Sequence, residues 1–115
     1  MEARTLIPIL YAQDARQSAR WYERLGFVVT GDHRFGPDFP WYLFLQWGDL
    51  QIHLSEHRGD ATPGTLVYLW VPAVDPIAQE FAATVEELPW ARQIEITDVD
   101  GNRWRIGERK TEEAP

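Results

Sequence analysis

The sequence predicts an α+β fold in which a βαβββ module occurs twice in tandem. Short segments in both halves alternate apolar with polar residues, as half-buried strands do. Two further segments carry apolar residues at helical spacing, and each follows a strand-like segment. A polar stretch at 56–64, rich in Gly, Pro and Asp, separates the halves, and the same order of elements starts again after it. We expect one domain over 1–115 with modules at about 5–56 and 64–107.

The first module should begin with a strand at 5–12 and a helix. Pro8 lacks an N–H group, which places this strand at a sheet edge or at a crossing between subunits. Asp14 is suited to cap the helix, and Gly26 is placed to end it. The apolar face of the helix would consist of Ala15, Ala19, Tyr22 and Leu25.

Three more strands complete the first module. A short strand is expected at 27–31, a loop at 32–40, and two strands joined by a tight turn at Gly48-Asp49. These two strands are predicted at 41–47 and 50–55. In the second of them polar residues alternate with Leu and Ile, so His53 lies on the polar face.

The second module repeats this plan. A strand is predicted at 65–71, and Asp75 with Pro76 should begin a second helix. The apolar face of that helix would consist of Ile77, Phe81 and Val85, beside Ala78 and Ala82. The pattern at 84–88 fits a helix or a strand. The final elements are predicted as a strand near 92–97, a turn at 98–102, a strand at 103–107, and a charged tail at 108–115.

Composition narrows the function. The chain has 115 residues without Cys, which excludes disulfides, thiolate nucleophiles and Cys-ligated metal sites. The formal net charge of −7 and the absence of a basic run argue against nucleic-acid binding. The negative charge either keeps the protein soluble or attracts a cationic partner. The N-terminus lacks the pattern of a signal peptide and no apolar run is long enough to cross a membrane, so a cytoplasmic protein is expected.

Aromatic residues are the main candidates for a binding site, because the sequence shows no catalytic triad and no phosphate-binding loop. Tyr68 and Trp70 share one strand face. Trp90 begins a strand, and Phe39 and Trp41 close the first long loop. We expect these side chains to stack on a planar ligand. Trp104, which alternates with two arginines, should instead lie in the core.

His53 admits two interpretations. It either contacts a ligand as a hydrogen-bonding group or base, or is a polar strand residue whose bonds are satisfied by Ser55, Gln51 or water. His53 has no obvious acidic partner that would make it a catalytic base, which favours the second interpretation.

The tandem modules resemble the vicinal oxygen chelate superfamily, which includes glyoxalase I, extradiol dioxygenases, and fosfomycin- and bleomycin-resistance proteins. The resemblance spans about 5–107. It depends on Asp14 with Trp21-Tyr22-Glu23-Arg24-Leu25-Gly26-Phe27, the segments 50–55 and 66–71, Pro89-Trp90, and Asp98-Val99-Asp100-Gly101-Asn102. It implies the glyoxalase/bleomycin-resistance fold, in which the modules form a curved mixed sheet.

Enzymes of this superfamily hold a divalent metal at four inward-facing strand positions. By motif register these positions are Ile7, His53, Leu66 and Arg105 here. Only His53 can ligate a metal, and one imidazole does not hold a divalent ion. The resemblance therefore implies a protein without metal, cofactor or catalytic residues, and it places Arg105 on the ligand-facing side.

Within the superfamily the chain is most similar to the bleomycin-resistance proteins. That similarity implies a homodimer that exchanges its first strand around Pro8 and binds bleomycin-type glycopeptides in grooves at the interface. Resistance would come from sequestration of the drug, with Phe39, Trp41, His53, Tyr68, Trp70, Trp90 and Arg105 as ligand-binding residues. Two alternatives remain: a metal-dependent lyase, isomerase or dioxygenase, and a binding protein for another small metabolite.

Overall fold

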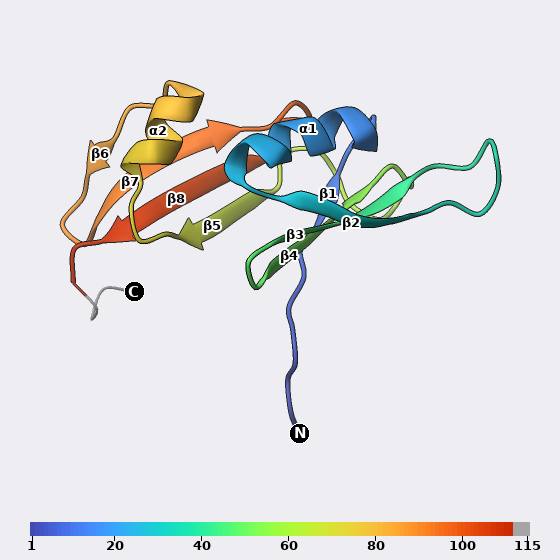
Figure 1. Ribbon diagram of the computed structural model, residues 1–115, viewed down its shortest axis with the longest axis horizontal. Helices are drawn as coiled ribbons and strands as arrows, with labels where there is room; N and C mark the ends of the chain where they lie inside the picture. The colour runs from blue at the N-terminus through green and yellow to red at the C-terminus, as the bar shows by residue number, and fades with distance from the viewer. Residues whose placement is uncertain (112–115) are drawn as a thin grey trace. The chain divides into compact units, whose positions relative to one another are not determined.

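The computed structural model describes residues 1–111 and confirms the predicted α+β fold. The chain divides into two compact units, Met1–Pro63 and a second that begins at Gly64. Each unit has one α-helix, one four-stranded mixed sheet and the order βαβββ (Figure 1). Neither helix among the described residues is long and apolar enough to cross a membrane.

The first unit contains five elements in the predicted order. They are β1 (Ile9–Tyr11), α1 (Ala15–Leu25), β2 (Val28–His33), β3 (Tyr42–Trp47) and β4 (Leu50–Ser55). The strands lie in the order β1-β4-β3-β2. The pairing of β1 with β4 is parallel and the other two pairings are antiparallel.

Helix α1 begins and ends where the sequence predicts. The Asp14 carboxylate accepts a hydrogen bond from the Gln17 backbone at 3.1 Å, which satisfies one free N–H of the first turn. Gly26 ends the helix at φ 128°, a conformation that favours glycine. A Cβ there would lie 2.7 Å from the Trp47 indole nitrogen, so glycine is also needed for close packing.

The bounds of three strands in this unit differ from the prediction, and β3 differs only by starting at Tyr42 instead of residue 41. The first strand covers only Ile9–Tyr11 instead of 5–12, because Pro8 has no N–H to give the ladder. The Pro8 carbonyl still accepts a bond from the His53 amide at 3.0 Å, and β1 lies at the sheet edge as predicted. Strand β2 begins one residue later than predicted and continues to His33, past a register shift between Val29 and Gly31.

The second unit has the same strand arrangement as the first. Its elements are β5 (Leu66–Trp70), α2 (Asp75–Phe81), β6 (Glu86–Glu87), β7 (Ala91–Thr97) and β8 (Arg103–Arg109). The sheet order is β5-β8-β7-β6, and β5 pairs with β8 in parallel. The segment that the sequence left undecided therefore contains a short strand, β6.

Helix α2 differs from the prediction at both ends. The capping position is Val74, and Asp75 does not cap the helix because its carboxylate is bonded by the Arg92 guanidinium at 2.9 and 3.0 Å. This pairing holds the pKa of Asp75 below its ordinary value. The helix ends at Ala82, whose backbone is left-handed with φ 51°, so Val85 lies outside the predicted apolar face.

The turn before β8 is built from the predicted Asp98–Asn102 segment. The Asp98 carboxylate accepts from the backbone amides of Asp100 and Asn102, at 2.8 and 2.9 Å. The buried Asn102 side chain accepts from the Thr65 amide at 3.2 Å, which ties this turn to the start of β5.

Trp104 lies in the core of the second unit, as predicted, with 2% of its surface exposed. Replacement by Ala leaves a cavity that the sheet cannot close, so Trp104→Ala should lower the free energy of unfolding by about 3–5 kcal/mol. Urea denaturation followed by circular dichroism measures this loss. A loss below about 1 kcal/mol would show that Trp104 is not a core residue.

Candidate functional site

Each unit has one sheet face in the core and one open face. In the first unit the core face packs against α1 and includes Leu10, Leu43, Leu45, Ile52 and Leu54. The alternate residues of β3 and β4 lie on the open face, and cross-strand pairing joins Phe44 to His53 and Tyr42 to Ser55. The side chains of Tyr42, Phe44 and His53 are only half-buried there.

His53 and Tyr42 form a hydrogen-bonded pair on this face. The Tyr42 hydroxyl lies 2.7 Å from the His53 Nδ1 atom. Burial lowers the pKa of His53, and burial together with the Asp60 charge raises the pKa of Tyr42. The hydrogen-bond partner of His53 on its own sheet is therefore Tyr42, and not Gln51 or Ser55.

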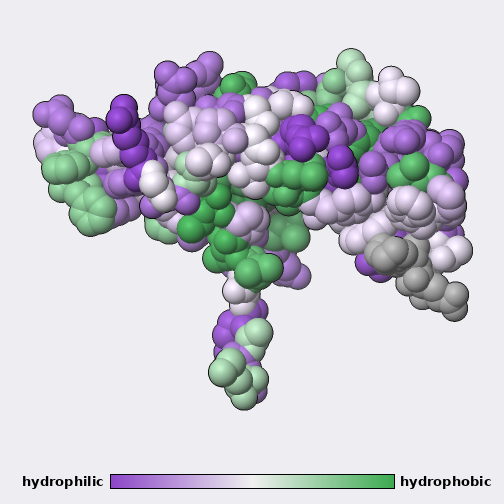
Figure 2. Space-filling model, turned by 180° about the vertical axis from the view of Figure 1, so that it is seen from behind, coloured by the Kyte–Doolittle hydropathy of each residue, from purple (hydrophilic) through white to green (hydrophobic). Residues whose placement is uncertain are grey.

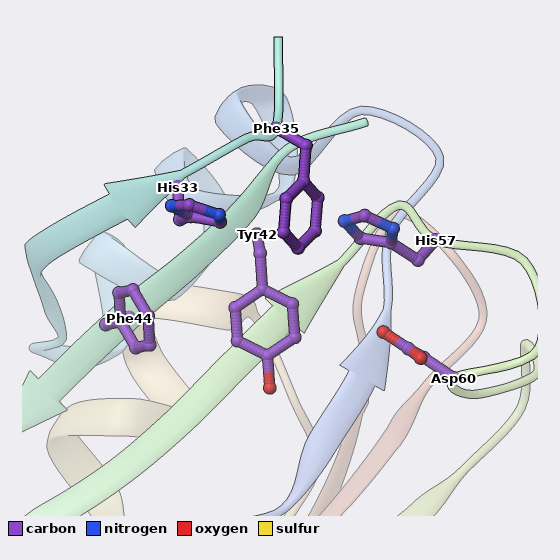
Figure 3. Close-up of a pocket in the computed structure, with 6 residues that line it drawn as sticks. All are labelled: His33, Phe35, Tyr42, Phe44, His57 and Asp60. Atoms are coloured by element: carbon purple, nitrogen blue, oxygen red, sulfur yellow. The ribbon is translucent and has the colours of Figure 1, made fainter. Parts of the chain in front are cut away.

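A pocket of about 280 Å³ opens beside this pair. Figure 3 shows Phe35 standing between His33 and His57, above Tyr42. The Phe35 ring is 4.7 Å from that of His33 and 6.0 Å from that of His57, nearly perpendicular to both. The pocket is lined by His33, Phe35, Tyr42, Phe44, His57 and Asp60.

Asp60 is the acidic group of the pocket. Its Oδ2 atom accepts a bond from the Ser55 hydroxyl at 2.6 Å, and the Ser55 hydroxyl oxygen in turn accepts from the His57 amide at 3.1 Å. The buried Ser55 side chain therefore fixes the turn that carries both His57 and Asp60.

Trp41, at the end of the loop after β2, is held in place by contacts from several parts of the first unit. The Arg16 and Arg34 guanidinium groups lie over the Trp41 ring, at 4.6 and 4.3 Å from its centroid. The Trp41 amide donates to the Glu56 carboxylate at 2.9 Å. A ligand that stacks on Trp41 would have to compete with these cations, whereas Phe39 is 57% exposed.

The open face of the second unit carries a fixed aromatic pair. The Tyr68 and Trp70 rings lie 4.9 Å apart. Both cover Gly107 of the neighbouring strand, where an added Cβ would clash with the Tyr68 hydroxyl. Glycine at this position therefore lets the two rings, which are tilted at 55° to each other, lie close to β8. The Arg109 guanidinium lies 4.5 Å from the Trp70 ring centroid.

Hydrogen bonds with neighbouring side chains hold the Tyr68 ring of this pair in place. The Tyr68 hydroxyl donates to the Gln93 side chain at 2.8 Å, and it is also bonded by the Trp90 side chain. Burial raises the pKa of Tyr68, while Trp90 and the Arg105 charge oppose that rise. Arg105 donates to the Glu95 carboxylate at 3.1 Å.

The structure thus brings together four of the seven predicted ligand-binding residues on the second unit: Tyr68, Trp70, Trp90 and Arg105. The other three, Phe39, Trp41 and His53, lie on the first unit. Neither Phe39 nor Trp41 lines the pocket of that unit. Sequence reasoning missed Tyr42, Phe44 and Asp60. Strand alternation could have placed the first two beside His53, but no sequence signal brings Asp60 to them.

The residues at the four positions implied for a metal are not suited to bind a metal ion. Ile7 and Leu66 carry no donor atom, Arg105 is paired with Glu95, and His53 is bonded to Tyr42. Among residues 1–111 no three His, Asp or Glu side chains gather in a way that could hold a metal ion.

A protein-family model described as "Glyoxalase superfamily protein" matches residues 1–113 of the chain. No curated protein matches the sequence. Solved structures with the same fold include a bleomycin-binding protein complexed with bleomycin, at 20% identity and TM-score 0.72, covering 94% of this chain and 100% of the other.

Two further structures have this fold. A glyoxylase/bleomycin resistance protein/dioxygenase domain from Frankia sp. EAN1pec is 19% identical with TM-score 0.77, and covers 96% of this chain and 99% of its own. TnmS3, an antibiotic binding protein from Streptomyces sp. CB03234, is 16% identical with TM-score 0.68, and covers 96% and 100%.

The lowered pKa of His53 predicts a pH dependence of stability. Below the ordinary value of 6.5 the unfolded chain takes up a proton at His53 before the folded chain does, so the free energy of unfolding decreases as pH falls. Wild type should therefore lose more stability between pH 7.5 and 5.5 than His53→Gln. Urea denaturation at both pH values measures the difference.

The control is the interval from pH 7.5 to 8.5, in which His53 stays neutral and the two proteins should change equally. Equal losses between pH 7.5 and 5.5, or an NMR titration of His53 with its pKa at or above 6.5, would contradict the assignment.

Proposed function

The chain belongs to the glyoxalase superfamily, and from this premise we propose that it is a non-catalytic binding protein for bleomycin-type glycopeptide antibiotics. It would confer resistance by sequestering the drug in grooves at a homodimer interface. The observation that carries the proposal is the aromatic surface of Tyr68, Trp70 and Trp90 on the open face of the second unit.

This surface is suited to a planar ligand because its rings are fixed before the ligand arrives. Tyr68 is bonded to Gln93 and Trp90, and the backbone of Gly107 supports the rings from below. A rigid aromatic surface loses little conformational entropy on binding. A flat heteroaromatic group gains about 0.5–1.5 kcal/mol from each offset ring contact beyond the area that it buries.

Sequestration is favoured over catalysis by the donor chemistry at the four positions implied for a metal. His53 is bonded to Tyr42 through Nδ1, and Arg105 to Glu95 through Nε. The positions that hold a metal in related enzymes supply one ligand. Binding requires only the rings and their surroundings.

A second candidate is a binding protein for another planar metabolite that carries an anionic group. Arg103 and Arg105 share one carboxylate, that of Glu95, at 3.7 and 3.1 Å, and Arg109 lies over Trp70. The open face of β8 therefore presents more cations than anions, which suits an anionic substituent better than the cationic tail of bleomycin.

The dimer of the proposal would use the N-terminal segment. Residues before β1 extend away from the sheet of the first unit (Figure 1), and Leu6 is 94% exposed. Hydrophobic surface gathers where this segment leaves the molecule (Figure 2). Exposed apolar residues beside the edge strand β1 are suited to pair with a second copy, with the exchange at Pro8.

Trp90→Ala should weaken bleomycin binding without unfolding the protein, because Trp90 is 43% exposed. The loss of one stacking residue is expected to cost roughly 1–3 kcal/mol, about one to two decades in Kd. Titration with metal-free and copper-loaded bleomycin, followed by calorimetry, measures the loss.

Trp104→Phe is the matched control, since it changes a Trp in the core and leaves the open face intact; its Kd should equal that of wild type. Unchanged affinity in Trp90→Ala would remove Trp90 from the site. If wild type does not bind bleomycin at high micromolar concentration, the second candidate replaces the first.

Light scattering at micromolar concentration should give twice the 13.4 kDa mass of one chain. A variant that lacks residues 1–7 should dissociate more readily, because it loses the segment that would cross between subunits. A wild-type monomer, or a truncated dimer of unchanged stability, would contradict strand exchange.

A further inference from the structure

We propose that the pocket of the first unit, between the β2–β3 loop and the turn at 57–60, is a binding site for a planar organic cation such as an amidinium or aryl-ammonium group. It is separate from the aromatic surface of the second unit. Its ligand class follows from the shape of the pocket, the orientation of its rings, and its one acidic group.

The size of the pocket fits one ring with a small charged substituent. Its volume is about 280 Å³, and rings line most of its wall. Tyr42 and Phe44 lie 5.5 Å apart with their planes tilted at 58°, so they form a corner and not a stack. Phe35, which is 74% exposed, stands above Tyr42 on the loop side of the pocket (Figure 3).

The charge of the pocket selects the sign of the ligand. Asp60 is the only carboxylate among the lining residues, and no Arg or Lys lines the pocket. Figure 3 shows the Asp60 carboxylate pointing toward Tyr42. Its Oδ2 atom is bonded to Ser55, whereas Oδ1 receives no hydrogen bond from residues 1–111. The free carboxylate oxygen is available to a donor in the pocket.

The aromatic rings of the pocket also favour a cationic ligand. Aromatic faces attract an organic cation through their quadrupole, by about 0.5–1 kcal/mol where the contact is exposed. A planar amidinium can donate to the Asp60 Oδ1 atom and keep its flat side against Tyr42 or Phe44. A neutral amide would keep the ring contacts without the charge, and a carboxylate would be repelled by Asp60.

Three probes of one shape test the charge preference: benzamidine, benzamide and benzoate at pH 8. NMR titration of the backbone amides locates each probe. Benzamidine should bind most tightly and benzoate most weakly, with shifts centred on His33, His57 and Asp60. The affinity for benzamidine, but not for benzamide, should fall as salt is raised.

Asp60→Asn removes the charge and keeps an oxygen that can accept from Ser55, so the turn should remain folded. It should weaken benzamidine by about fivefold and leave benzamide unchanged. Asp49→Asn is the matched control, because it removes the same charge from the hairpin turn at the other end of β3 and β4.

Equal affinity for the three probes, an unchanged preference in Asp60→Asn, or shifts centred on Tyr68 and Trp70 would each overturn the proposal. If the Asp60 variant does not fold, the salt dependence of benzamidine binding to wild type still tests the proposal. The bleomycin titration is a separate measurement, so either binding activity can fail while the other holds.

Discussion

One interaction recurs in both modules, and the open faces depend on it: a glutamate at the end of the last strand binds the start of the helix. The Glu56 carboxylate accepts from the Ala15 amide at 2.7 Å, and the Glu108 carboxylate accepts from the Val74 amide at 3.0 Å. Each glutamate satisfies a free N–H of the first turn and places negative charge at the positive end of the helix. Each bond thereby ties the start of the helix to the end of the last strand of its own module.

In the first unit this interaction also reaches the loop around the pocket. The second oxygen of Glu56 accepts from the Trp41 amide, and two arginines lie over the Trp41 ring. One of them, Arg34, donates to the Pro37 carbonyl at 2.5 Å. The contacts therefore fix both ends of the loop that carries Phe35. Trp41, which the sequence marked as a ligand contact, has a supporting position in this arrangement.

The sequence predicted what local patterns determine. The tandem order, helix α1 with its Asp14 cap, the core position of Trp104 and the shared face of Tyr68 and Trp70 all follow from spacing of two or 3.6 residues. The predicted cap of the second helix was wrong, because a residue distant in the sequence competes for the capping side chain. Asp75 does not cap its helix because Arg92, seventeen residues later, binds its carboxylate.

The candidate site was less predictable for the same reason. Trp90 reaches Tyr68, and Asp60 reaches Ser55, through loops whose conformation has no periodic signal. Gly107 in β8 could be recognised only once its strand neighbour was known, because the reason for glycine is the Tyr68 ring on β5. The contribution of a residue to a binding surface therefore depended on cross-strand register, which one sequence does not specify.

The two modules have kept one backbone plan while their open faces have diverged in charge. His53 in β4 and Arg105 in β8 each lie three residues before the glutamate that holds the helix, so they occupy equivalent positions of the repeat. At one position stands an imidazole bonded to a tyrosine, and at the other a guanidinium bonded to a carboxylate. An imidazole can ligate a metal ion and a guanidinium cannot, so these two equivalent positions supply at most one metal ligand. The open face of each unit therefore offers a ligand its own chemistry: an imidazole beside Tyr42 in the first, and a guanidinium beside Tyr68 in the second.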